Sequence, residues 1–241
     1  MPYGYYYGFD WTYLVLVLPC MILALIASSN VNSTFKKYSR QLSSRRITGA
    51  DAAQRVLSAN GVRGVRIERV AGNLTDHYDP KTNVIRLSDS VYSSTSTAAI
   101  GVACHEAGHA VQYAQNYAPI KLRAAIIPIT NFGSKLAMPL ILIGILCTFL
   151  GEFSTMLVYL GIAAFGLSFV FQLVTLPVEF NASRRAIQAI EQGNILTDDE
   201  LRGARKTLKA AAMTYVAATA TALAQLLRLI VLFGGRGRRR D

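Results

Sequence analysis

IIPITNFGSKLAMPLILIGILCTFLGEFSTMLVYLGIAAFGLSFVFQLVTL, residues 126–176, is a long apolar stretch with one short polar link, GEFS, at residues 151–154. The apolar run on either side of the link is long enough to cross the hydrocarbon core of a bilayer as a helix. Because lipid offers no hydrogen bonds to backbone groups, helices are the expected spanning structure. The stretch therefore predicts a hairpin of two spanning helices, the second ending at Pro177, and its two crossings return the chain to the side from which it started.

The composition also indicates a membrane protein, since 52% of the 241 residues are hydrophobic and only 16% are charged. An earlier apolar run, Trp11 to Ala27, predicts an N-terminal transmembrane anchor over residues 11–28. It is followed by five basic residues: Lys36, Lys37, Arg40, Arg45 and Arg46. Because cytoplasmic loops are enriched in lysine and arginine, the N-terminus is expected outside and the next segment in the cytoplasm.

The net charge of +11 is concentrated beside the apolar segments. This placement favours a lipid bilayer with anionic headgroups as the partner of the basic residues. Nucleic acid is not expected as a partner, because no basic and aromatic recognition element occurs outside the apolar segments.

Residues 30–122 have the pattern of a small cytoplasmic α+β unit. The stretch from Thr48 to Gly61 predicts a helix with a cap at each end. Three stretches with strand-like alternation follow, VRGVRIERV, LTDHYD and NVIRLS. Capping residues over 93–97 then introduce a helix through GVACHEAGHAVQYAQN.

The C-terminal part, residues 177–233, predicts further helices, the last beginning near Thr197. Its continuation, residues 208–233, is long enough to span a bilayer, but Gln225 and Arg228 interrupt it. A fourth membrane helix is the preferred interpretation, and a helix that packs on the hairpin or lies in the interface is the alternative. Residues 234–241 are a basic tail to which no chemistry is assigned.

The segment His105-Glu106-Ala107-Gly108-His109 has the spacing HExxH. On a helix, side chains at i and i+4 share one face, so both imidazoles can hold one Zn²⁺ while Glu106 reaches a water beside it. Only three histidines occur in the chain, so a chance match is on the order of a one-in-a-hundred event. The alternative is a helix with two polar positions on a packed face.

Catalytic zinc usually has three protein ligands, and Glu179 is the best third candidate. The two crossings of the hairpin put Glu179 on the same side of the membrane as His109. The alternative is a carboxylate at a helix start, or a partner of Arg184 or Arg185. Two imidazoles and one carboxylate leave the zinc unit positively charged, which suits Glu106 as the general base toward water.

The sequence also predicts the roles of two further side chains, Cys104 and His77. Cys104 is predicted to be a small buried residue rather than a reactive thiol. The preferred interpretation of His77 is a turn histidine bonded to Asp76 or Asp79. A catalytic role for His77, stabilising the tetrahedral intermediate or pairing with a substrate carboxylate, stays open. The stretches LTDHYD, which contains His77, and NVIRLS are expected to form a β-hairpin. If the edge of this β-hairpin faces the zinc, a substrate can add to it as an extended strand.

The stretches VACHEAGHAVQ, LTDHYDP and LPVEFNASRRA together resemble the bacterial membrane-bound neutral zinc metallopeptidases of the YugP type, over nearly the whole chain. More distantly, the chain is similar to membrane gluzincins. The resemblance implies that His105, His109 and Glu179 are ligands and Glu106 the base. Ser183 stands where the distant relatives commonly have an aspartate that supports a ligand histidine, so Ser183 or Asn181 is expected in that supporting role.

The expected fold is therefore an α+β membrane protein, a transmembrane helical bundle with a small zincin-like unit of helix and β-hairpin. The expected function is a zinc-dependent endopeptidase acting on membrane-associated or misfolded polypeptides. It is expected to be a multi-pass protein of the bacterial plasma membrane with the zinc site on the cytoplasmic side. The alternatives are a zinc-stabilised scaffold or adaptor without peptidase activity, and a small transporter, which the scarcity of charged residues in the spans disfavours. The sequence does not determine the substrate or whether the chain forms a homo-oligomer.

Overall fold

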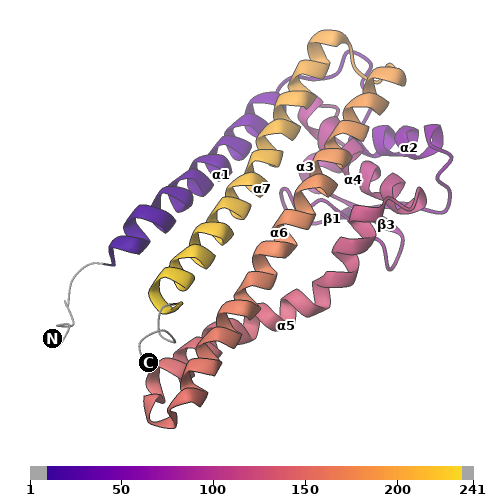
Figure 1. Ribbon diagram of the computed structural model, residues 1–241. Helices are drawn as coiled ribbons and strands as arrows, with labels where there is room; N and C mark the ends of the chain where they lie inside the picture. The colour runs from indigo at the N-terminus through magenta and orange to yellow at the C-terminus, as the bar shows by residue number, and fades with distance from the viewer. Residues whose placement is uncertain (1–9, 235–241) are drawn as a thin grey trace. The chain divides into compact units, whose positions relative to one another are not determined.

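The computed structural model describes residues 10–234 (Figure 1), so the predicted basic tail lies outside the described residues except for Gly234. The elements follow one another as η1 Tyr13–Val17 (a π-helical turn), α1 Leu18–Tyr38, α2 Gly49–Ala59, β1 Arg66–Val70, β2 His77–Asp79, β3 Val84–Ser88, α3 Asp89–Tyr92, α4 Thr97–Ala114, α5 Ala118–Leu146, η2 Thr148–Leu150, α6 Glu152–Gln192 and α7 Asp198–Phe233. The chain is thus mostly helical, with one small sheet.

The chain divides into two compact units, each built from segments distant in sequence. We call the unit formed by Ile26–Ile126 and Leu173–Val216 the mixed unit, because it contains the sheet. We call the unit formed by Met1–Leu25, Ile127–Gln172 and Ala217–Asp241 the hairpin unit. Helices α1, α5, α6 and α7 each contribute residues to both units.

The sheet of the mixed unit has the strand order β1-β3-β2. The predicted antiparallel pair is confirmed, since β2 pairs with β3 and His77 lies opposite Arg86. In addition, β1 pairs with β3 in parallel, with Ile67 opposite Ile85, which the sequence did not predict. The central strand β3 is the most buried, and both β1 and β2 are edge strands.

The short helices of the mixed unit begin where the sequence predicts. Thr48 caps α2 in a capping box with Asp51, and Gly61 follows the helix end with a φ of 66°. Ser96 caps α4 by accepting a hydrogen bond from the backbone N–H of Ala99. These caps fix the start of α4 eight residues before the first motif histidine, so the motif lies in the middle of a regular helix.

Within residues 10–234, four helical segments are long and apolar enough to cross a membrane: Tyr13–Tyr38, Ala118–Leu146, Glu152–Gln192 and Asp198–Phe233. The first continues to Tyr38, well beyond the apolar run that predicted the anchor. The prediction that the hairpin's second helix ends at Pro177 was wrong, because α6 continues through it to Gln192. A proline removes one N–H donor and crowds one carbonyl, but the helical turns on either side keep their bonds.

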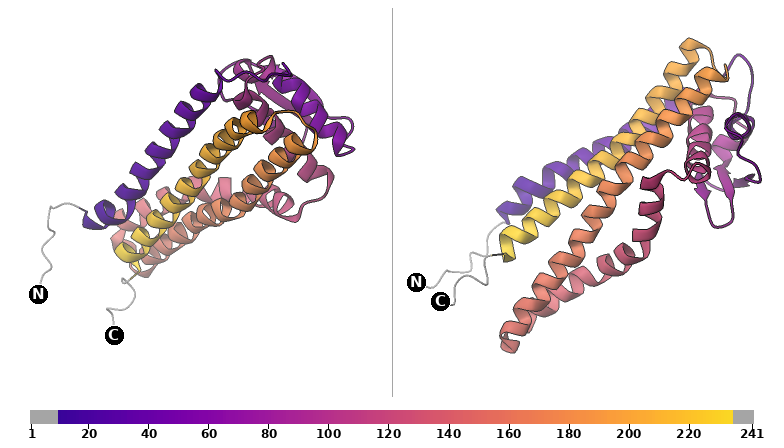
Figure 2. Two further views of the ribbon diagram at one scale, coloured as in Figure 1. Left: turned by 90° about the horizontal axis from the view of Figure 1, so that it is seen from above. Right: turned by 45° about the vertical axis from the view of Figure 1, so that its right-hand side comes forward.

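In the hairpin unit, α5 and α6 lie side by side near the turn that joins them (Figure 2), and glycines on both helices permit close packing. A Cβ added to Gly144 would lie 2.6 Å from the Ser154 carbonyl oxygen. A Cβ added to Gly161 would lie 2.7 Å from the Ala137 carbonyl oxygen and 2.6 Å from a side-chain carbon of Ile141. Small residues let helices approach closely where lipid provides no hydrophobic driving force.

The charge in the last helix has a partner within the same unit. The Arg228 Nε donates to the Asp10 carboxylate at 2.9 Å, and its guanidinium lies over the Tyr13 ring. Thr221, two turns earlier on α7, donates to the Cys20 carbonyl at 3.3 Å. These contacts show that α7 runs antiparallel to the start of the first helical segment. The pairing with Asp10 accounts for the presence of Arg228 in an apolar segment.

Replacing Gly161 by alanine should destabilise the protein by about 1–3 kcal/mol, because the new methyl group overlaps backbone and side-chain atoms of α5. The measurement is the midpoint of thermal unfolding in detergent. Gly166→Ala on the same helix is the matched control, since its nearest neighbour, a methyl of Leu226, would be 4.0 Å away. Equal midpoints for the two variants would contradict this account of the hairpin.

Candidate metal centre

Helices α4 and α6 touch at Gly108, the fourth residue of the motif. A Cβ at this position would lie 2.8 Å from the carbonyl oxygen of Ala182. Only glycine permits this approach, and on α6 Ala182 is flanked by Glu179 three residues before it and Ser183 directly after it. The glycine inside the motif therefore brings one face of α6 against the two histidines.

Three potential ligand atoms converge at this crossing. The Nε2 atom of His105 lies 3.3 Å from Oε2 of Glu179, and the Nε2 atom of His109 lies 3.5 Å from the same oxygen. The two imidazole rings meet edge to face with their centroids 4.7 Å apart. Among residues 10–234, this trio is the group of histidine, cysteine and carboxylate side chains able to hold a metal ion, with its ligand atoms within 4.8 Å of one another.

The remaining ring nitrogens are held by neighbouring side chains. Nδ1 of His109 lies 3.0 Å from Oε1 of Gln112, which accepts its hydrogen, and Nδ1 of His105 lies 3.1 Å from the hydroxyl of Ser183. A hydrogen on Nδ1 leaves the Nε2 lone pair free to bind a cation. Gln112 is itself fixed, because its amide donates to the Val178 carbonyl at 2.8 Å and to Asn181 at 3.0 Å.

The Glu179 carboxylate is oriented from two other helices. Arg123, near the start of α5, donates to its Oε1 at 2.8 Å. Tyr215, on α7, forms a side-chain hydrogen bond with the same carboxylate and lies within electrostatic reach of Glu106. With Oε1 engaged by arginine, Oε2 is the atom presented to the two histidines, so Glu179 is set up as a ligand through one oxygen.

The donor set fits a metal ion because of the hydrogen-bonding needs of its buried atoms. Oε2 of Glu179 is buried and has no hydrogen-bond partner among the described residues. It faces two nitrogens that are also acceptors when Nδ1 carries the hydrogen, and a buried acceptor without a donor is costly. Burial opposes a charge on His109, yet the Glu179 and Glu106 carboxylates outweigh it and raise the pKa of this imidazole. A cation is therefore electrostatically favoured between the three side chains, and two nitrogens with one oxygen suit zinc.

Glu106 is buried on α4, with only 8% of its surface exposed, between the two histidines in sequence. Asp76, just before β2, lies close enough to Glu106 for their charges to interact. Burial raises the pKa of Asp76, although the Ser88 N–H and hydroxyl donate to it. Further along, the Tyr78 and Tyr113 rings pack 5.7 Å apart. Strand β2 therefore runs beside the motif helix.

The other predicted residues fall outside the trio. His77 is exposed on the edge strand β2, and its Nδ1 lies 2.8 Å from the Thr75 carbonyl rather than bonding to Asp76 or Asp79. Cys104 has no exposed surface, and burial raises the pKa of its thiol, which confirms the prediction of a buried, unreactive side chain.

Three residues that support the trio were not identified from the sequence. Gln112 lies three residues after His109 on the same helix face, and this spacing could have pointed to it. Arg123 and Tyr215 had no such signal, because each reaches Glu179 from a helix that is distant in sequence. Of the two supporting candidates named from sequence, Ser183 contacts His105 directly, whereas Asn181 contacts the glutamine that supports His109.

In the described part of the chain, four long apolar helices and a largely buried cluster of two histidines and a glutamate define a membrane-type protein with a candidate zinc centre. Residues 13–234 match the family described as "Putative neutral zinc metallopeptidase", and the chain belongs to this family. It is 45% identical over 221 residues to the "Putative membrane protease YugP" of Bacillus subtilis (strain 168), a match covering 92% of this chain and 96% of that relative. The comparison confirms the resemblance seen in the sequence. No solved structure matches the chain.

Gln112→Leu should weaken zinc binding by about 10–100-fold, because His109 loses the acceptor that orients its ring and α4 loses its polar tie to α6. The measurement is competition for zinc between the purified protein and a fluorescent chelator. Gln54→Leu, at an exposed position of α2, is the control and should bind zinc as the wild type does. Unchanged affinity in Gln112→Leu would show that this glutamine does not support the site.

Proposed function

We propose that the protein is a membrane-embedded, zinc-dependent endopeptidase in which His105, His109 and Glu179 hold Zn²⁺ and Glu106 is the general base. The observation that carries the proposal is the unpartnered Oε2 of Glu179, buried 3.3 and 3.5 Å from two imidazole nitrogens. The family match supports the reaction class. The site offers three protein ligands and a neighbouring base, Glu106, which is the arrangement of a catalytic zinc site. A purely structural zinc site normally has four protein ligands.

A zinc ion bound here supplies polarisation of a peptide carbonyl and a more acidic water. Glu106 would accept a proton from the attacking water and pass it to the leaving amine nitrogen. Its burial beside the trio keeps the carboxylate within reach of such a water. Arg123 holds Glu179 in place during this sequence and adds positive charge beside the forming oxyanion.

The edge strand β2 is the proposed docking element for the substrate backbone. It lies at the side of the sheet, beside α4, with the Tyr78 and Tyr113 contact joining the two. An extended peptide adding to this edge gains main-chain hydrogen bonds that do not depend on its side chains. The proposal therefore expects a broad substrate class of membrane-associated or misfolded polypeptides. We propose that His77, which is exposed on this strand, contacts a carboxylate of the bound substrate or the tetrahedral intermediate.

The proposal assigns the site to the cytoplasmic side of a multi-pass protein in the bacterial plasma membrane. Its support is the charge of the mixed unit, where basic residues follow the apolar parts of α1 and α6. These residues are Lys36, Lys37, Arg40, Arg45, Arg46, Arg184 and Arg185.

Glu106→Gln should bind zinc as the wild type does and lose at least about a hundredfold in cleavage rate, because the amide cannot accept the water's proton. The assay is cleavage of an unfolded membrane protein by the purified chain in detergent, followed on gels, with zinc content measured in parallel. His109→Ala is the companion variant and should lose both zinc and activity. If Glu106→Gln cleaves at the wild-type rate, Glu106 is not the base.

Removing zinc with a chelator should abolish cleavage, and adding back about one equivalent should restore it, since no other group of the site can polarise the carbonyl as strongly. Thermal unfolding in detergent, measured before and after removal, separates this proposal from a zinc-stabilised scaffold. A scaffold loses stability on zinc removal but shows no cleavage of a broad substrate panel in any state.

A further inference from the structure

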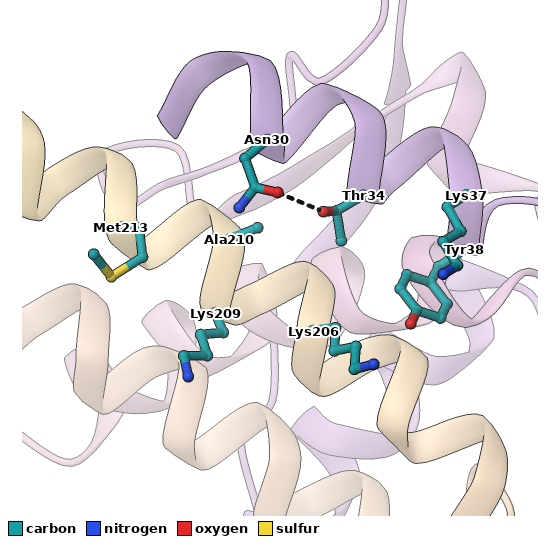
Figure 3. A pocket seen from close by; sticks show the side chains of 8 residues that line it. All are labelled: Asn30, Thr34, Lys37, Tyr38, Lys206, Lys209, Ala210 and Met213. Atoms are coloured by element: carbon teal, nitrogen blue, oxygen red, sulfur yellow. Dashed lines mark hydrogen bonds between the residues drawn. The ribbon is translucent and has the colours of Figure 1, made fainter. Parts of the chain in front are cut away.

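The mixed unit contains a second polar site, a groove between α1 and α7 with a volume of about 310 Å³ (Figure 3). Its lining comes from the end of α1 and the start of α7: Asn30, Thr34, Lys37, Tyr38, Lys206, Lys209, Ala210 and Met213. None of these residues contributes a ligand to the candidate metal centre. The groove therefore needs an explanation of its own.

Helical spacing explains why these side chains line one groove. On α1 the lining residues recur at 30, 34 and 37, and on α7 at 206, 210 and 213, both with the period of a single helix face. The two faces are held together by Gly203, where an added Cβ would lie 2.8 Å from the Tyr38 ring. The lysines of the groove are thus brought together by packing and not by a local sequence cluster.

The groove is rich in positive charge and hydrogen-bond donors. Its three ammonium groups, on Lys37, Lys206 and Lys209, are exposed, and within residues 10–234 none forms an ion pair with a carboxylate. No acidic residue lines the groove. Thr34 donates to the side-chain oxygen of Asn30 at 3.3 Å, which leaves the Asn30 amide hydrogens as further donors. Mutual repulsion of the lysines is relieved by an anion that offers several acceptor oxygens.

The position of the groove along the helices indicates where that anion comes from. On α1 it begins three residues after Ala27, where the apolar run ends. On α7 the groove extends from Lys206 to Met213 and so overlaps the start of the apolar continuation at residue 208. At about 1.5 Å per residue, Lys206 lies about 3 Å and Lys37 about 15 Å along the helix from the apolar segments, and long lysine side chains can reach back toward the headgroup region, which is about 5–8 Å deep on each side of the core. Met213 and Ala210 give one end of the groove an apolar lining, whereas a soluble anion needs no such surface.

We infer that this groove binds the phosphate headgroup of an anionic phospholipid, with the lysines on the phosphodiester and the apolar end against the glycerol and first acyl carbons. The lipid thereby connects the first and last membrane helices on the side of the mixed unit. This site is independent of peptidase activity, because its residues and its ligand are separate from the metal centre.

The test is native mass spectrometry of the full-length protein in detergent, titrated with phosphatidylglycerol or phosphatidylcholine. Phosphatidylglycerol should bind at least about tenfold more tightly. The triple variant Lys37→Gln, Lys206→Gln, Lys209→Gln should lose at least about tenfold in affinity for it, given on the order of fivefold per lysine. The charge-matched control Lys36→Gln, Arg40→Gln, Lys81→Gln changes three exposed residues outside the groove lining and should stay within about twofold of the wild type.

Three results would overturn the inference. Equal loss in the two triple variants would mean diffuse attraction to the basic surface. Equal binding of the two lipids would mean that the headgroup charge is not recognised. Competition by soluble glycerol phosphate as effective as that by phosphatidylglycerol would assign the groove to a free phosphate compound. Replacing the same three lysines by arginine keeps the positive charge and should keep the affinity for phosphatidylglycerol. This variant shows whether the glutamine variant loses binding through the loss of charge or through misfolding.

Discussion

The burial of the Glu179 carboxylate against two imidazoles is the constraint on which the rest of the site depends. A buried carboxylate is stable only when charge and hydrogen bonds compensate for its lost hydration. Here one oxygen receives a guanidinium hydrogen from Arg123, and the other is left facing His105 and His109 without a donor. The helices therefore hold Glu179 close to Arg123, His105 and His109. A cation between the carboxylate and the two imidazoles would satisfy Oε2 of Glu179, the acceptor that has no donor.

Close helix packing meets this requirement through small residues. Gly108 lets α6 approach α4 within the motif, and Gly101, two turns earlier, lets α7 approach the same helix, with an added Cβ 3.3 Å from the Ala204 Cα. Helix α4 is thus held from two sides, and the polar contacts of Gln112 and Ser183 fix the ring orientations between them. Glu179, the candidate third ligand, belongs to a helix that continues through Pro177 from an apolar segment, so it is carried by a helix long and apolar enough to cross a membrane. This continuity explains why the glutamate can be so distant in sequence from the histidines.

The large positive charge of the chain has more than one role. Arg123 acts inside the site, on Glu179, and Arg185 donates to Asn181, which belongs to the hydrogen-bond network of Gln112. Arg228 is paired with Asp10. Lys37, Lys206 and Lys209 differ from these arginines, because they line an open groove and form no ion pair with a carboxylate within residues 10–234. Planar guanidinium groups suit fixed contacts with carboxylates and amides, whereas lysines suit an exchangeable anion at the membrane surface.

Sequence alone determined the features that are encoded locally. The positions of the two histidines and Glu106 follow from the spacing of one helix, and the apolar helices follow from composition and length. The prediction of Glu179 as a ligand is not local, because it depends on counting two crossings of the membrane. The caps of α2 and α4 are equally local, since each involves residues within one turn. Tertiary structure alone decided that β1 pairs with β3, that α6 passes through Pro177, and that Arg123, Tyr215 and the groove lysines come together. The reason is physical: helical and strand periodicity fixes which face a side chain occupies, but its partner on another element is set by how closely the two backbones can pack.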